Sequence, residues 1–490
     1  MTEARGPRRR LVGLVAGPLV FTVVLAWPLP ELSAAAHTLA AIFGWAVVYW
    51  VSEALPPAVT ALLASVLAVV LGVAPAPAVL APYADPVIFL FLGSFLLAEA
   101  TRSSGLDRRL AFSVLRAGWA SRTTARILAA LGIVTCALSL WLSNTTTTAI
   151  MLPIGLGVLR QLGELGDATR SRFPTGLLLM LTWSSSVAVG VPVGSPPNLI
   201  AIGMVRDLAG RRLTFVDWML VTLPLTVVML GVCWLILWLR YGAGRPAAGP
   251  NGDRAVAETL AVGPWHRAEV NVVVVFVLAV ALWMLPGAAL LVAPDAPASR
   301  ALEAHLPEAA VALLAAVLLF VLPVDFARGR LTLDWSAAGR IDWSTILLFG
   351  GGLSLGRLMF DTGLAPAVGG AVLGASGAGS LWALTAGAIV AGVVLSETSS
   401  NTASASVVIP VVIAAAQSAG VSPVPPALGA ALGASFGFML PVSTPPNAIV
   451  YGSGLVPLPE MIRSGIILDI VGAGLIWVAL RLLCPLFGVM

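Results

Sequence analysis

A polar segment at residues 139–148 interrupts a long apolar run of this sequence. It reads Ser-Leu-Trp-Leu-Ser-Asn-Thr-Thr-Thr-Thr and carries six hydroxyl groups and one amide. Because Ser, Asn and Thr are favourable N-caps, we expect a helix to end near Leu142 and another to begin near Thr145. The second helix presents free N–H groups and a partial positive charge, which suit an anion. The free carbonyl groups of the first helix suit a small hard cation such as Na⁺.

The same Ser-Asn-Thr triplet occurs twice, at 143–145 and at 400–402. A single triplet is better explained by hydroxyl groups that bond to the preceding helical turn, or by close packing of small residues between helices. The recurrence favours a pair of broken helices that face one binding site.

A second motif, Pro-Pro-Asn, is also paired, at 196–198 and 445–447. Proline lacks an N–H group and disfavours helical backbone in the residue before it, so each span should unwind here. We expect Asn198 and Asn447 to cap the helix that resumes. The alternative is a simple proline kink.

Ionisable residues inside apolar spans are costly and commonly functional. Glu397 lies four residues before Asn401, on the same helical face, and is predicted either to orient its neighbours or to hold a proton. Other such residues lie near predicted span ends, where we expect structural pairing or interfacial positions. These are Glu53, Glu99, Arg357, Asp361 and Asp469. No basic residue is expected at the triplets.

Composition places these motifs in a membrane protein. Of 490 residues, 59% are hydrophobic and 10% are charged, whereas soluble domains carry about 25% charged residues. The length accommodates about a dozen spans of roughly 20 residues. The 27 basic residues are all Arg and form no run suited to nucleic acid. Three Cys residues show neither disulfide nor metal spacing. No nucleophile–base set or phosphate loop is visible, so we expect no enzyme.

The two halves of the chain repeat each other. Four short motifs, the two above among them, recur in the same order at offsets of 249 to 258 residues. A polar linker at 241–267 separates the halves. Duplicated halves of this kind are typical of secondary transporters.

Arginine distribution predicts how the halves are oriented, because cytoplasmic loops collect basic residues. The stretch 102–126 holds six Arg, and its counterpart in the second half holds none. The repeats are therefore predicted to be inverted, with a cytoplasmic N-terminus and an extracytoplasmic C-terminus. All but six Arg then lie on the cytoplasmic side. The exceptions are Arg206, Arg211, Arg212, Arg300, Arg357 and Arg481. The first three form a cluster that counts against this orientation.

The paired triplets and paired Pro-Pro-Asn motifs resemble the divalent anion:sodium symporter family of the ion transporter superfamily, which includes sodium–dicarboxylate cotransporters. The resemblance extends over nearly the whole chain. It implies an all-α polytopic fold with inverted repeats, about eleven transmembrane helices and two re-entrant helical hairpins. It also implies a homodimer in which a transport domain moves like an elevator against a scaffold. The expected division is scaffold 11–118, transport 119–240, cytoplasmic linker 241–267, scaffold 268–378 and transport 379–490.

The resemblance also implies two sets of binding residues and no organic cofactor. The substrate-binding residues would be Ser143, Asn144, Thr145, Ser400, Asn401, Thr402, Thr444 and Pro445. One Na⁺ would contact Ser139, Ser143, Asn144 and Gly194, and another would contact Ser396, Ser400, Asn401 and Ser443.

The predicted function is Na⁺-coupled symport of a C4 dicarboxylate such as succinate, malate or fumarate across the cytoplasmic membrane. The alternatives are a Na⁺-independent dicarboxylate exchanger and a symporter for sulfate or a tricarboxylate such as citrate. A membrane-embedded enzyme would need a catalytic cluster, and a cation/proton antiporter would need an Asp at the membrane midplane beside these triplets.

Overall fold

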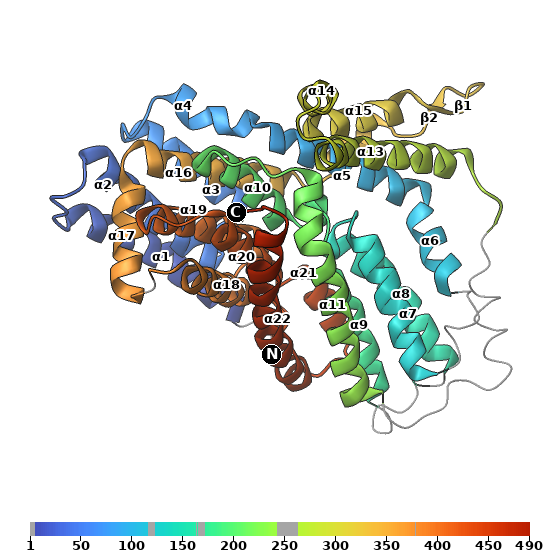
Figure 1. Ribbon diagram of the computed structural model, residues 1–490. Coiled ribbons are helices and arrows are strands. Elements are labelled where there is room, and N and C mark those ends of the chain that lie inside the picture. Colours follow the sequence, from blue (N-terminus) through green and yellow to red (C-terminus); the bar gives the residue numbers. More distant parts are fainter. Residues whose placement is uncertain (1–4, 116–122, 163, 165–171, 243–262, 378) are drawn as a thin grey trace.

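The computed structural model describes residues 5–115, 123–162, 164, 172–242, 263–377 and 379–490. Nearly all of them form helices (Figure 1). The first half contains α1 (Arg5–Ala26), α2 (Ala34–Ser52), α3 (Pro57–Val70), α4 (Ala76–Leu80), α5 (Pro86–Ser104), α6 (Leu106–Leu115), α7 (Thr124–Ser139), α8 (Asn144–Gln161), α9 (Phe173–Ser186), α10 (Pro196–Ala209) and α11 (Phe215–Tyr241). The second contains α13 (Arg267–Val292), α14 (Pro297–His305), α15 (Glu308–Val321), α16 (Trp343–Asp361), α17 (Leu364–Ser376), α18 (Leu381–Thr398), α19 (Asn401–Ser418), α20 (Val424–Ser435), α21 (Pro445–Tyr451) and α22 (Leu458–Leu486).

A small sheet and three 3₁₀ turns complete the described part of the chain. Strands β1 (Pro323–Asp325) and β2 (Arg330–Leu331) form an antiparallel hairpin after α15. The 3₁₀ turns are η1 (Ala81–Ala84), η2 (Pro192–Gly194) and η3 (Trp335–Arg340). The expectation of helices throughout missed this short hairpin, which has too few residues to give a period-two hydrophobic pattern.

Helix lengths confirm a protein with many membrane spans. Among the described residues, nine helices are long and apolar enough to cross a membrane, and α14 with α15, bent by 55°, is a broken span or a re-entrant loop. An unwound segment separates α9 from α10, and another separates α20 from α21. The nine include α18 and α19, whereas α3 is a shorter apolar helix. The expected division into eleven transmembrane helices and two re-entrant hairpins stays a prediction.

The two halves pack by reciprocal exchange of equivalent helices. Helix α5 packs on α15 of the second half, and α16 packs on α3 of the first half. In the part that carries the motifs, α10 packs on α19 and α20, while α21 packs on α8 and α9. Reciprocal contacts between equivalent elements are what a two-fold relation between repeats generates.

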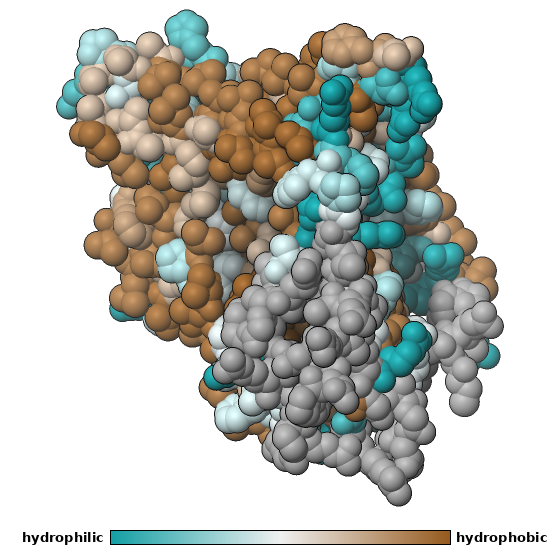
Figure 2. Space-filling model, turned by 90° about the vertical axis from the view of Figure 1, so that its right-hand side faces the viewer, coloured by the Kyte–Doolittle hydropathy of each residue, from teal (hydrophilic) through white to brown (hydrophobic). Residues whose placement is uncertain are grey.

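The outer surface carries large apolar areas (Figure 2). Large hydrophobic side chains are exposed along α1, α13 and α22, including Val15, Val277 and Ile470. Continuous apolar surface of this extent is incompatible with water and suits lipid chains. The buried core, in contrast, is concentrated in α9, α19 and α20, whose side chains are buried almost all round. These helices support the segments described next.

Candidate functional site

The first hairpin breaks where the sequence predicts. Helix α7 ends at Ser139, and α8 begins at Asn144. Ser143 is the N-cap of α8, and its hydroxyl oxygen accepts a hydrogen bond from the Thr146 N–H at 3.2 Å. Ser143 and Thr145 are exposed, and Asn144 is half-buried. The first turn of α8 is thus available to an anion.

The second hairpin repeats this geometry. Helix α18 ends at Thr398, α19 begins at Asn401, and Ser400 is its N-cap. The Ser400 hydroxyl oxygen accepts from the Ala403 N–H at 3.2 Å. Thr402 is buried, whereas Ser400 and Asn401 are half-buried. The second tip is therefore less open than the first.

A serine one turn before each break bonds to the asparagine of the triplet. The Ser139 hydroxyl lies 2.8 Å from Asn144 Oδ1 and 3.0 Å from the Ser185 carbonyl oxygen. The Ser396 hydroxyl lies 2.8 Å from Asn401 Oδ1 and 2.8 Å from the Ala434 carbonyl oxygen. Both clusters bring hydroxyl, amide and carbonyl oxygens together, which are ligands suited to a hard cation.

Two unwound segments lie beside these clusters. The backbone is not α-helical from Val187 to Ser195 and from Phe436 to Thr444. The Asn198 Nδ2 group donates to the carbonyls of Val189 and Val191, at 3.3 and 3.0 Å. The Asn447 Nδ2 group donates equivalently to Gly437 and Leu440, at 2.9 and 3.0 Å.

The expectation that these two asparagines cap the resuming helices is therefore wrong. Each lies in the third position of its helix, and the N-cap positions belong to Ser195 and Thr444. The amide instead folds back onto the unwound segment and donates to two carbonyl groups that accept no i+4 hydrogen bond of a regular helix.

The missing side chain of Gly194 allows close backbone packing beside the oxygen cluster of Ser139 and Asn144. A Cβ atom on Gly194 would lie 2.6 Å from the Ala188 carbonyl oxygen and 3.1 Å from that of Leu140. In the second half the corresponding close contact is at Gly437, where a Cβ atom would lie 3.1 Å from Ser396 Oγ. In the part of the chain that the structure describes, no three His, Cys, Asp or Glu side chains gather as a metal site. The clusters of neutral oxygens fit Na⁺ better than a transition metal.

Glu397 anchors the second unwound segment. Its carboxylate accepts from the backbone N–H groups of Met439 and Leu440, at 2.9 and 3.2 Å, and from the Ser443 hydroxyl. The sequence left two roles open for Glu397, to orient its neighbours or to hold a proton. These hydrogen bonds match the orienting role. The Ser443 hydroxyl donates its hydrogen to Glu397, and its oxygen keeps lone pairs that can contact an ion.

Asp469 does not lie near a span end, contrary to expectation. It occupies the interior of α22, is 5% exposed and lies against Glu397. The sequence position was misleading because α22 runs for 29 residues and begins well before the apolar run. Glu99, in contrast, forms ion pairs with Arg102 and Arg340, at 2.8 and 2.6 Å, as expected for a residue near a span end.

The structure gathers the predicted residues into two separate groups. The first tip opens into a cavity of 890 Å³ that includes Thr145 and Thr146. No residue of 400–402 lines this cavity, Thr444 is buried, and Pro445 is exposed. The two halves contact each other through buried side chains. The Thr182 hydroxyl donates to Asn447 Oδ1 at 2.8 Å, and Ser195 Oγ lies 3.0 Å from Ser435 Oγ.

Basic side chains lie closer to the tips than the sequence predicted. Arg102, Arg108 and Arg340 line the same cavity as Thr145. Arg9 donates to the carbonyl oxygen of Thr398, at the end of the second hairpin's first arm. In the sequence, the Arg-rich stretch 102–126 predicted only the orientation of the halves. It is separated from the triplet 143–145 along the chain, so the sequence did not indicate that Arg102 and Arg108 lie beside the first tip.

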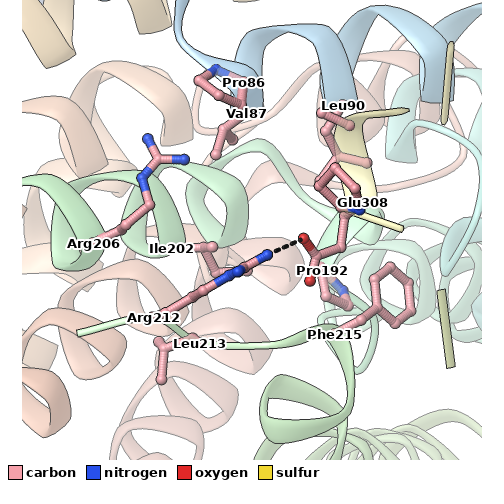
Figure 3. Close-up of a pocket in the computed structure, with 12 residues that line it drawn as sticks. Pro86, Val87, Leu90, Pro192, Ile202, Arg206, Arg212, Leu213, Phe215 and Glu308 are labelled. Atoms are coloured by element: carbon pink, nitrogen blue, oxygen red, sulfur yellow. Dashed lines mark ion pairs between the residues drawn. The ribbon is translucent and has the colours of Figure 1, made fainter. Parts of the chain in front are cut away.

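Two arginines of the cluster Arg206, Arg211 and Arg212 have acidic partners, and Figure 3 shows the pair of Arg212 with Glu308. Arg206 pairs with Asp85 and, at 2.8 Å, with Asp207. Arg212 lies 3.3 Å from Glu303 and 3.7 Å from Glu308. Arg206, Arg212 and Glu308 line a cavity of 280 Å³ between α5, α10 and α15. The orientation rule counts basic residues and not net charge, so the cluster still counts against the predicted orientation.

Comparison with known proteins identifies the family. Residues 8–488 match the family described as "Sodium:sulfate symporter transmembrane region". The chain belongs to this family. The match confirms the family resemblance and the expectation of a transporter instead of an enzyme.

Two curated relatives cover almost the whole chain of this family member. A protein of Staphylococcus aureus strain bovine RF122, named "Sodium-dependent dicarboxylate transporter SdcS", is 32% identical over 488 residues, covering 97% of this chain and 92% of that protein. The protein of the same name from strain MRSA252 is 31% identical with the same coverage.

Two solved structures share the fold. The YdaH transporter of Alcanivorax borkumensis aligns with a TM-score of 0.52 and 14% identity, covering 81% of this chain and 85% of that one. MtrF of Neisseria gonorrhoeae, described among antimetabolite efflux pumps, aligns with a TM-score of 0.53 and 12% identity, covering 81% and 80%. At these identities the likeness concerns architecture alone.

Proposed function

We propose that this protein is a Na⁺-coupled symporter of a C4 dicarboxylate such as succinate, malate or fumarate. The observation that carries the proposal is the pair of hairpin tips, each with a Ser-Asn-Thr triplet at a helix start and a serine bonded to its asparagine. The names of the S. aureus relatives supply the substrate class and the sodium dependence.

In this proposal, each hairpin tip binds one Na⁺ through some of its residues and the substrate carboxylates through others. The oxygens of Ser139, Asn144 and the Gly194 region hold one Na⁺, and those of Ser396, Asn401 and the backbone near Ser443 hold another. A bound Na⁺ beside a helix start adds full positive charge to the partial charge of the helix, so the carboxylates bind after the ions. The substrate carboxylates contact residues 143–145 and 400–402, with Thr444 and Pro445 at the edge.

The wider mechanism follows from the family resemblance. The segments 119–240 and 379–490 form a transport domain that moves as an elevator against the scaffold 11–118 and 268–378, and the protein works as a homodimer. The N-terminus and the linker 241–267 face the cytoplasm, and the C-terminus faces the other side. The reciprocal packing of α10 on α19 and of α21 on α8 supports a motif-bearing part built from both halves.

Uptake by reconstituted protein tests the function. Proteoliposomes are given labelled succinate with an inward Na⁺ gradient, with equal Na⁺ on both sides, or with choline in place of Na⁺. We expect accumulation only with the gradient. Uptake that needs internal dicarboxylate and ignores Na⁺ would identify an exchanger. Competition by unlabelled sulfate or citrate stronger than that by succinate would move the substrate to those anions.

A further inference from the structure

One wall of the cavity at the first hairpin tip consists of residues outside the proposed Na⁺ and substrate sites. It lies between α8 on one side and α5, α6 and η3 on the other, and its volume of 890 Å³ is that of a small-molecule site. The α8 wall is apolar beyond Thr145 and Thr146, with Ala149, Ile150 and Pro153. The opposite wall carries charged side chains.

Positive charge exceeds negative charge on that opposite wall. Arg102 bonds to both oxygens of Glu99, at 2.8 and 2.9 Å, and Arg340 bonds to the same carboxylate at 2.6 Å. One carboxylate shared by two guanidinium groups leaves one positive charge unbalanced. Glu99 itself is 6% exposed, so this charge is held in place by a buried anchor.

Arg108 adds a second positive charge to the cavity. Its side chain is exposed and forms no ion pair with any residue in the described part of the chain. The neighbouring Asp107 carboxylate accepts the Arg108 backbone N–H at 2.7 Å and is buried. Burial raises the pKa of Asp107, against the hydrogen bond and the charges of Arg108 and Arg102, which lower it. Even with Asp107 ionised, the five charged side chains of the cavity sum to a positive charge.

We propose that this cavity is an outer binding site for the substrate dianion, in which Arg108 draws the dianion toward the first hairpin tip. The inference rests on the proposed function, because it takes a dicarboxylate as substrate. A cleft with a net positive charge and low-dielectric walls raises the local concentration of anions. The free N–H groups at the start of α8 extend the same field to Thr145.

The Arg108→Gln variant tests the role of this charge, with Arg328→Gln as the matched control. Arg328 is also exposed, lies on the β1–β2 turn 3.8 Å from Asp325 and does not line the cavity. Initial rates of succinate transport are measured in inside-out and right-side-out vesicles from expressing cells, at constant Na⁺ in phosphate-free buffer. Ionic strength is set with choline chloride at a low and a high value.

The expected result is one-sided and dependent on salt. For Arg108→Gln the apparent KM rises about threefold to tenfold at low ionic strength when succinate approaches the Arg-rich face, and the difference falls below about twofold at high ionic strength. Transport from the other face, and both faces of Arg328→Gln, remain as in the wild type.

Three outcomes would overturn the inference, and they are distinguishable. Equal kinetics of Arg108→Gln and the wild type, with normal wild-type uptake, removes the outer site alone. A difference that vanishes when purified protein is placed in vesicles of phosphatidylcholine only identifies an acidic lipid headgroup as the occupant in place of substrate. Absence of wild-type succinate transport refutes the proposed function and this inference with it.

Discussion

At the scale of single residues, the account depends on two asparagines in equivalent positions. Asn144 and Asn401 each bond to a serine of the preceding helix through the amide oxygen. Two hydroxyl–amide pairs of the same geometry in two halves of a chain are hard to explain by helix capping alone, since capping is already performed by Ser143 and Ser400.

Replacement of either asparagine should abolish transport without unfolding the protein. Asn144→Ala and Asn401→Ala remove an ion ligand and a substrate contact, so we expect Na⁺-driven uptake to fall more than about a hundredfold, the loss that follows from about 3 kcal/mol at each site. Asn271→Ala is the control, because Asn271 bonds to Pro323 and Thr332 away from both tips. Near-normal uptake by both site variants would refute the site assignment.

A methyl group at Gly194 should weaken Na⁺ binding more than substrate binding. The added Cβ meets two backbone carbonyl oxygens that cannot move as a flexible side chain can. We expect Gly194→Ala to raise the Na⁺ concentration for half-maximal uptake by about tenfold, equivalent to roughly 1.4 kcal/mol. Gly231→Ala in α11 has open space around the new methyl group and should change nothing. If both variants behave alike, Gly194 does not border an ion site.

At the scale of elements, each of the two unwound segments is held by an asparagine that lies C-terminal to it, and the second is also held by Glu397. Asn447 illustrates this, because its amide donates to Gly437 and Leu440 and accepts from Thr182 in the other half. The motif and the break were predictable from sequence, since paired prolines exclude regular helix. The direction in which the asparagine points was not, since it depends on which carbonyl groups the fold leaves without partners.

Loss of the Asn447 side chain should therefore destabilise the protein as a whole. Asn447→Ala leaves the Gly437 carbonyl and the Thr182 hydroxyl without this partner in a buried place, at about 1–3 kcal/mol for each unsatisfied group, whereas the Leu440 carbonyl still accepts from the Ser443 N–H at 3.2 Å. We expect a lower midpoint of thermal unfolding for the purified protein in detergent, measured by intrinsic fluorescence. Asn271→Ala, which is half-buried, should show a much smaller shift. An unchanged midpoint for Asn447→Ala would show that the unwound segment needs no such support.

At the scale of the whole molecule, the repeated sequence motifs predicted more of the architecture than hydrophobic periodicity did. The recurring motifs identified the pairs α7/α8 with α18/α19 and α9/α10 with α20/α21, and these pairs are present. The reciprocal packing of the halves and the position of Arg102, Arg108 and Arg340 beside the first tip depend on contacts between distant segments. A single sequence carries no direct record of such contacts.

The ion pair between Asp85 and Arg206 offers a test of the elevator movement. Asp85 precedes α5 in the proposed scaffold, and Arg206 lies in α10 of the proposed transport domain. A reducible bis-thiol cross-linker whose span replaces that of the Arg206 side chain should join Asp85→Cys to Arg206→Cys and arrest uptake, and a reductant should restore it. The native cysteines 136, 233 and 484 are buried, so the wild type and each single variant treated with the same reagent serve as controls. Full uptake by a cross-linked double variant would mean that α5 and α10 do not separate during transport.

The central claim is that Na⁺ ions complete the binding site for the dianion, and calorimetry of the purified protein tests it most directly. Succinate is titrated into the wild type in NaCl and, separately, in choline chloride at the same ionic strength. The account predicts heat of binding in NaCl, none in choline chloride, and none in either salt for Asn144→Ala or Asn401→Ala. Equal succinate affinity in the two salts would contradict it.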